Sequence, residues 1–242
     1  MDLALFSGAG YEMILRWIHY MSGVAWIGLL YYFNFVQVPF FAEADAAVRS
    51  GAIIKLVPRA LWWFRWAAMF TFLSGFLILM RYAMDPAAKG GPAWFGTIQG
   101  AAISIGALLG TLMFLNVWFV IWPNQKIVIA STTAVAGGGQ ADPRAANAAA
   151  RGFVASRTNA MFSLPMLFFM AATSHLPMTM AEGKKIGMPM GIITLVILAL
   201  EVNVLIGKKG QGFNKLLEKV PGVIHLGLLL ALIFYFVLDG LL

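Results

Sequence analysis

The chain has three histidines, and each lies within a long apolar segment. His19 and His175 fall at similar distances from the midpoints of their segments, roughly 9 to 12 Å along a helix that rises about 1.5 Å per residue. If both termini lie on the outer face of the membrane, both histidines lie in its outer half and share a depth. On the same arithmetic His225 lies in the inner half of its segment, roughly 20 Å away along the membrane normal. Polar side chains inside membrane spans are costly and are functional candidates by default.

Two histidines at one depth on different helices match the needs of a b-type haem. The axial imidazoles approach the iron from opposite faces, and the helix bundle must leave a slot for the ring. His19 and His175 are therefore the predicted metal ligands. The alternative is that each histidine hydrogen-bonds a neighbouring helix or lies at the level of the lipid headgroups.

Small and basic residues near the two histidines agree with such a slot. Small side chains one turn from each histidine would admit a flat macrocycle or a close helix. Two arginines toward the outer face are expected to pair with the haem propionates. The predicted cofactor-binding residues are Arg16, Ser22, Gly23, Arg81, Ala171 and Ala172.

A second polar set lies in the inner halves of the apolar segments. Its members are Asn34, Arg65, Asn116, Glu201, Asn203 and His225. Because apolar residues flank Glu201, its carboxyl group needs a partner such as Arg65 or His225, or it stays protonated. One interpretation is a quinone pocket, a proton relay or a second cofactor site. The other, which we favour, is an interhelical clasp that fixes packing.

Six apolar segments must position these side chains. They cover roughly residues 11–41, 59–82, 94–122, 158–181, 186–206 and 221–242. Each crossing of a bilayer needs roughly 20 apolar residues, and in lipid a single segment satisfies its backbone only as a helix. We predict an all-α integral membrane bundle of about six transmembrane helices in one domain, residues 1–242. The connection 123–157 is expected to be a surface loop in which Asp142 caps a short helix and Pro143 is its first residue.

The composition restricts the possible functions. The chain is 61% hydrophobic and 11% charged, whereas a soluble domain is nearer half apolar and about a quarter charged. The absence of cysteine excludes disulfides, thiolate metal sites and the covalent attachment of a c-type haem. The net charge is +7, and the lysines and arginines that carry it lie in short connections, where they set the topology and contact anionic lipid. We therefore expect no nucleic-acid partner.

The basic residues divide unequally between the two faces of the predicted bundle. Connections one, three and five, together with Arg65, hold twelve of the 17 lysines and arginines. Basic residues in short loops stay cytoplasmic. We therefore expect both termini on the outer, periplasmic face of a bacterial inner membrane.

Four sequence blocks carry a family resemblance. They are 16–19 (RWIH) with 23–28 (GVAWIG), 63–66 (WFRW) with 74–75 (SG), 116–118 (NVW) with 121–126 (IWPNQK), and 163–165 (SLP) with 174–175 (SH). These blocks resemble the N-terminal domain family of the membrane-bound urate oxidases, bacterial urate hydroxylases with a cytochrome c domain behind a helical membrane domain. The retained His19 and His175 are therefore expected to keep whatever role, ligation or structure, the family gives them.

The chain also departs from the family pattern. It reaches Leu242 without a cysteine, so it resembles a short form that lacks the cytochrome c domain and cannot pass electrons onward within itself. Thr158 stands where the family tends to have a histidine, and Ala67 where it tends to have an acidic residue. These two differences argue against urate oxidation.

Three functions follow from these observations. The leading hypothesis is a membrane-embedded haem b protein or redox subunit that transfers electrons with a partner, either another membrane subunit or an electron-transfer protein. If it is an enzyme, it is an oxidoreductase acting with that partner. A second hypothesis is a cofactor-free accessory subunit of a larger membrane enzyme, and a third is a membrane urate oxidase.

Overall fold

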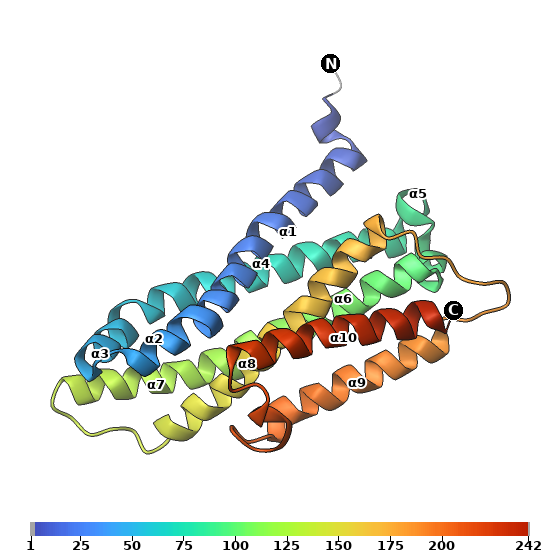
Figure 1. The fold of residues 1–242 in the computed structure, drawn as a ribbon. Coiled ribbons are helices and arrows are strands. Elements are labelled where there is room, and N and C mark those ends of the chain that lie inside the picture. Colours follow the sequence, from blue (N-terminus) through green and yellow to red (C-terminus); the bar gives the residue numbers. More distant parts are fainter. Residues whose placement is uncertain (1–2, 242) are drawn as a thin grey trace.

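The computed structural model describes residues 3–241, and these residues form helices and no strand. In chain order the helices are η1 (Ala4–Phe6), α1 (Gly8–Tyr31), η2 (Tyr32–Gln37), α2 (Val38–Glu43), α3 (Ala46–Lys55), α4 (Val57–Met84), α5 (Pro86–Lys89), η3 (Gly91–Gly96), α6 (Ile98–Leu115), η4 (Asn116–Ile121), α7 (Trp122–Ala136), α8 (Ala145–His175), α9 (Gly187–Ile206), η5 (Gly212–Lys215) and α10 (Val220–Gly240). Figure 1 shows them as an elongated bundle.

Five continuous helices are long and apolar enough to cross a membrane. They are Gly8–Glu43, Val57–Met84, Ile98–Ala136, Gly187–Ile206 and Val220–Gly240. Many of their large apolar side chains are exposed, as expected of a surface that faces lipid. The predicted all-α membrane bundle is therefore confirmed.

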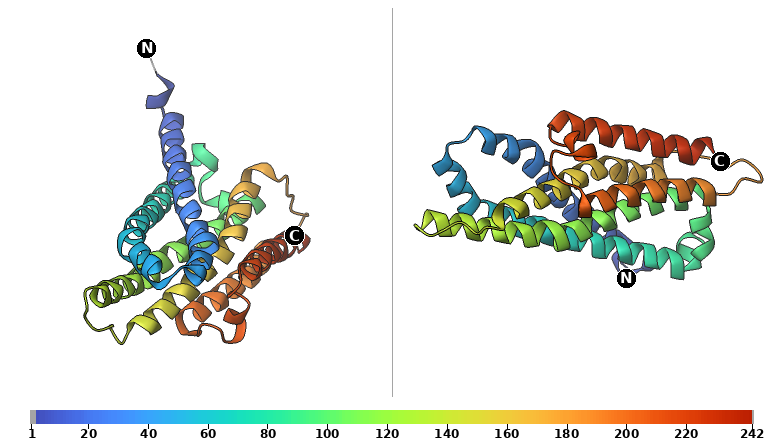
Figure 2. Two further views of the ribbon diagram at one scale, coloured as in Figure 1. Left: turned by 60° about the vertical axis from the view of Figure 1, so that its left-hand side comes forward. Right: turned by 90° about the horizontal axis from the view of Figure 1, so that it is seen from below.

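Helix α8 contains most of the fourth predicted crossing, residues 158–181, and lies inside the bundle. It has 31 residues, but polar residues such as Arg157, Asn159 and Ser163 lower its mean hydropathy. These three side chains are buried, so the polar face of α8 is covered by its neighbours rather than by lipid. It packs mainly on α6, α7 and α10, while α9 and α10 lie together on one side of it (Figure 2).

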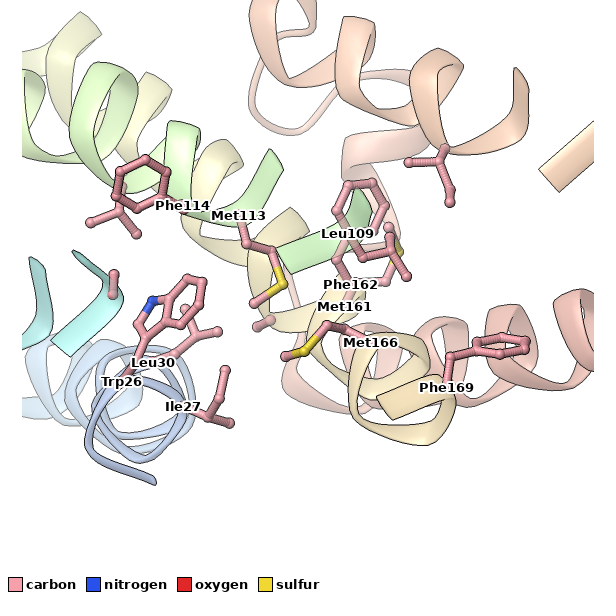
Figure 3. Close-up of a cluster of buried hydrophobic side chains, with 14 of the residues drawn as sticks. Trp26, Ile27, Leu30, Leu109, Met113, Phe114, Met161, Phe162, Met166 and Phe169 are labelled. Carbon is pink, nitrogen blue, oxygen red and sulfur yellow. The ribbon is translucent and has the colours of Figure 1, made fainter. Parts of the chain in front are cut away.

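The apolar core forms where α1, α6 and α8 meet. Trp26, Leu30, Met113, Met161 and Phe162 are each at most 2% exposed. Figure 3 shows these side chains pointing into a shared interior from the three helices. The core therefore places α8 between α1 and α6.

The predicted surface loop over 123–157 is wrong in its extent. α7 continues to Ala136 and α8 begins at Ala145, so only residues 137–144 connect them. Alanine is the best helix former, and the alanine-rich sequence on both sides extends each helix. Asp142 does not cap a helix that starts at Pro143. Its Oδ1 atom accepts a bond of 2.8 Å from the backbone N–H of Arg144, and hydrogen bonds from Arg144 lower the pKa of Asp142 to about 2.

Two of the long helices contain a π-helical stretch just before a proline. η2 ends two residues before Pro39, and η4 ends two residues before Pro123. A proline has no N–H and its ring clashes with the carbonyl group four residues earlier, which disrupts the α-helical bonding pattern. The bonds shift by one residue: the N–H of Val38 donates to the carbonyl of Phe33, and that of Trp122 to Val117.

Glycine allows a close approach of α10 to α8. A Cβ atom on Gly227 would lie 2.4 Å from Leu164 Cδ1 and 2.7 Å from the carbonyl oxygen of Met161. Both distances are far below van der Waals contact, and the second atom belongs to the backbone. No side chain fits at this crossing, as is typical of small residues at membrane helix interfaces.

We predict that Gly227→Ala lowers the free energy of unfolding by about 1 to 3 kcal/mol, because overpacking a tight contact forces the two helices apart. The matched control is Gly191→Ala in α9, where a Cβ atom would meet no atom within 4 Å. Thermal denaturation in detergent should show a lower midpoint for the first variant and an unchanged or slightly higher one for the second. Equal midpoints would contradict the contact.

Candidate functional site

His19 lies between α1 and α4 and is held by α4. Its Nδ1 atom is 2.9 Å from the carbonyl oxygen of Thr71 and 3.3 Å from Ser74 Oγ. A carbonyl oxygen only accepts hydrogen bonds, so Nδ1 carries the proton and Nε2 presents a lone pair. The ring rests on Gly75, where a Cβ atom would come within 2.9 Å of Cε1. The side chain is half-buried, and Nε2 has no hydrogen-bond partner within residues 3–241.

His175 is the last residue of α8 and is exposed. Within the described part of the chain, no hydrogen bond or ring contact joins it to His19, whose partners all come from α1 and α4. The structure thus brings His19 together with Thr71, Ser74 and Gly75. It does not bring the two histidines into contact, and their pairing on one haem stays a prediction.

The small residues near His19 serve the packing of α1 on α4. Thr71 Oγ1 donates a bond of 2.9 Å to Ser22 Oγ, and a Cβ atom on Gly23 would lie 3.8 Å from Thr71 Cγ2. Ser22 also lines a shallow apolar groove of about 270 Å³ with Trp17, Ile18, Met21 and Phe70. On α8, Ala171 is exposed and Ala172 is buried.

Arg16 and Arg81 both bind a carboxylate that the sequence reasoning did not consider. Arg16 Nε donates to Glu12 Oε1 over 2.9 Å, and Arg81 Nε lies 3.4 Å from Glu12 Oε2. Tyr82 also donates to Glu12 Oε1 over 2.9 Å. The spacing of Glu12 and Arg16, four residues on one helix, could have indicated this pair. Both arginines have acidic partners within the described chain, and their pairing with haem propionates stays a prediction.

The inner polar set does not form one cluster. Asn34 Nδ2 donates to Ser156 Oγ over 2.8 Å, which joins η2 to α8. Arg65 stacks on aromatic rings, with its Cζ atom 3.9 Å from the centroid of Trp122. Asn203 pairs with Asn214 over 2.7 Å. His225 is exposed on α10.

Glu201 has a different partner from those predicted. Asn116 Nδ2 donates to Glu201 Oε2 over 3.1 Å and to Asn159 Oδ1 over 3.0 Å. Asn159 Nδ2 donates in turn to the carbonyl oxygen of Met113 over 2.9 Å. Neither Arg65 nor His225 bonds to Glu201 within the described chain: Arg65 stacks on Trp122, and His225 is exposed. The result is a clasp that joins η4, α8 and α9.

Sequence reasoning missed most of the polar residues of α8. Ser156, Asn159 and Ser163 recur every three to four residues and so lie on one face of the helix. Ser163 bonds Tyr31 over 2.9 Å, which adds a third link from this face. That periodicity was the available signal, and the placement of residues up to 157 in a loop obscured it.

Comparison with protein-family models identifies the family of the chain. Residues 93–232 match the model of the family described as Urate oxidase N-terminal. The chain belongs to this family. The match covers more than half of the sequence and contains all of α6 to α9. Comparisons with curated proteins and with solved structures give no match.

The family match contains two of the four sequence blocks that suggested it. The blocks around Trp122 and His175 lie inside residues 93–232, whereas those around His19 and Arg65 lie before them. Of the two departures, Thr158 is fully buried and its hydroxyl oxygen has no hydrogen-bond partner in the described structure. Ala67 is buried in α4, where its carbonyl oxygen accepts from Thr71 Oγ1.

We predict that Asn116→Ala destabilises the protein by about 1 to 2 kcal/mol, since it leaves Glu201 and Asn159 each without a donor. Glu201→Gln should have little effect, because its amide oxygen still accepts from Asn116. Thr111→Ala is the matched control on the same long helix, since that hydroxyl bonds only to Ala107 of its own helix. Thermal denaturation in detergent measures all three. A loss for Glu201→Gln equal to that for Asn116→Ala would instead require the carboxylate itself.

Proposed function

We propose that this member of the Urate oxidase N-terminal family is a membrane redox protein that holds a b-type haem through His19. The observation that carries the proposal is the hydrogen bond between His19 Nδ1 and the carbonyl oxygen of Thr71. Histidines that ligate metals commonly donate their other ring N–H to a carbonyl or carboxylate oxygen, which fixes the tautomer and the ring orientation. The free Nε2 atom of His19 is then the ligating atom.

The surroundings of His19 fit one axial ligand of a haem. Gly75 leaves room for the imidazole on α4, and Ser74 adds a second polar contact to the same nitrogen. The apolar groove beside Ser22 lies one turn from His19 on α1 and could accept part of an apolar ring. These features support His19 as a ligand, whereas nothing in the contacts of His175 brings it to the same site.

A bound haem would supply one-electron transfer. The residues of this chain would hold and tune it: Thr71 and Ser74 keep His19 in one orientation, and hydrogen bonding to Nδ1 raises the basicity of Nε2. The groove is apolar, so it excludes water from the face that it covers. The electron would pass to a partner, another membrane subunit or an electron-transfer protein, because the described chain offers one such site.

Absorption spectra of the purified full chain, oxidised and then reduced with dithionite, test this proposal. The decisive variant is His19→Asn, whose side-chain amide can still donate to Thr71 but has no second ring nitrogen. We expect at least a tenfold loss of haem per protein with little change in thermal stability. His225→Ala is the control and should leave the spectrum unchanged.

His175→Ala separates two forms of the site. Loss of a low-spin spectrum would support the predicted pair of axial histidines. An unchanged spectrum would leave His19 as the one histidine ligand. Protein that carries no haem after expression in haem-replete cells would contradict the proposal, and so would full haem content in His19→Asn. The accessory-subunit hypothesis would then take its place.

We also propose that the chain lies in a bacterial inner membrane with both termini outside. α3, the α7–α8 connection and the α9–α10 connection lie at the end of the bundle away from the C-terminus, and most basic residues belong to that end (Figure 1). The positive-inside rule then places that end in the cytoplasm. Alkaline phosphatase, which is active only outside the cytoplasm, should be active when fused after Leu242. A green fluorescent protein at the same point should stay dark, and the reverse result would contradict this orientation.

Urate oxidation is a second candidate, and the family match favours it. It would be supported if membranes that contain the chain consume urate, followed as loss of urate absorbance, faster than membranes that contain the His19→Asn variant. The two departures at Ala67 and Thr158 stand against it. Absence of urate consumption in haem-loaded membranes would exclude this candidate and leave the electron-transfer proposal intact.

A further inference from the structure

Arg157 is the one fully buried charged residue in the part of the chain that the structure describes. It is 1% exposed and lies in α8. Its Nε and Nη1 atoms are buried and have no hydrogen-bond partner among residues 3–241. It also takes part in none of the ion pairs of these residues. Arginine is almost never fully buried unless it is paired, so this side chain lacks the partner it requires.

A second cation, Lys209, lies beside the aromatic ring of Phe153, which Arg157 also contacts. Arg157 Cζ is 5.1 Å from the centroid of Phe153, and Lys209 Nζ is 4.5 Å from that centroid. Because both groups lie about 5 Å from one ring centroid, they are less than about 10 Å apart, roughly the Debye length at 0.1 M salt. Lys209 belongs to the α9–α10 connection, which therefore reaches over α8 at Arg157.

The acidic residues nearby do not compensate these charges. Glu218, in the same connection, folds against Gly210, where its Oε1 atom would lie 3.1 Å from an added Cβ. Glu218 forms no ion pair within the described residues. Glu201 accepts from Asn116 and forms no ion pair within the described residues. Two neighbouring cations, one of them buried, are thus left without a counter-charge.

We infer that Arg157 and Lys209 form a binding site for an oxyanion of the phosphate type. The guanidinium group of an arginine matches a phosphate in geometry, and two cations match its charge. Burial strengthens such a contact because less water screens it. The anion would be a free phosphate or the headgroup of an anionic phospholipid. This site is separate from His19 and does not depend on the proposed haem.

The experiment measures the thermal unfolding midpoint of the purified full chain in a neutral detergent against inorganic phosphate, with sodium chloride at matched ionic strength as the reference. A parallel series places the chain in vesicles of phosphatidylcholine, with or without phosphatidylglycerol. Stabilisation by phosphate beyond chloride supports a site for a free oxyanion. Stabilisation by phosphatidylglycerol alone supports a site for a lipid headgroup. No stabilisation in either series overturns the inference.

Two variants locate the effect. Lys209→Gln should weaken the apparent affinity for the stabilising anion about tenfold, whereas Lys208→Gln, its exposed neighbour, should change it less than twofold. Equal effects of these two would mean general attraction to a basic loop and would overturn the site. Arg157→Met should abolish the response and, in the absence of the anion, raise the unfolding midpoint, because an unpaired buried charge is removed. A lower midpoint would mean that Arg157 is a packing residue. If Arg157→Met does not fold, the comparison of Lys209→Gln with Lys208→Gln still tests whether the anion binds at this site.

Discussion

The fold depends on the need to satisfy the polar side chains of α8 within an apolar bundle. In lipid, an unpaired polar group costs several kcal/mol, and no water is present to compensate it. α8 therefore lies where its neighbours supply partners for Ser156, Asn159 and Ser163. These partners are Tyr31 and Asn34 from the first long helix and Asn116 from the third. The apolar core at Trp26, Met113 and Phe162 closes around these links. Hydrogen bonds give α8 its position and orientation, and apolar contacts fill the remaining space.

The two ends of the bundle use charge in different ways. At the end near the N-terminus, Glu12 gathers Arg16, Arg81 and Tyr82, so that α1 and α4 are joined by a largely compensated cluster. At the other end the cations face aromatic rings, as Arg65 does with Trp122 and Arg157 with Phe153. An aromatic face offsets only part of the cost of a buried cation. The two arginines around Glu12 therefore have carboxylate partners within the described chain, whereas Arg157 and Lys209 have none.

The sequence was sufficient to predict the class of fold and the family but not the pairing of its polar residues. Lengths of apolar sequence identify membrane helices, because one bilayer imposes one length on all of them. The same apolar sequences carry little information about how each helix is rotated about its own axis, since several faces of one helix are similarly apolar. Glu201 illustrates this limit: its need for a partner could be read from its neighbours, but the choice of Asn116 over Arg65 depends on how η4 turns. The contact of His19 with Thr71 likewise depends on which face of α1 meets α4.

The π-helical stretches also affect how this sequence is compared with others. Successive residues of an α-helix are rotated by about 100°, and a π turn accommodates an additional residue within its turn. The faces of α2 and α7 are therefore out of phase with those of α1 and α6, although each pair forms one continuous rod. A constant helical period extended across η2 or η4 would assign residues beyond Pro39 or Pro123 to the wrong side. To separate lipid-facing from interior positions along this sequence, the helical phase must therefore change at these two points.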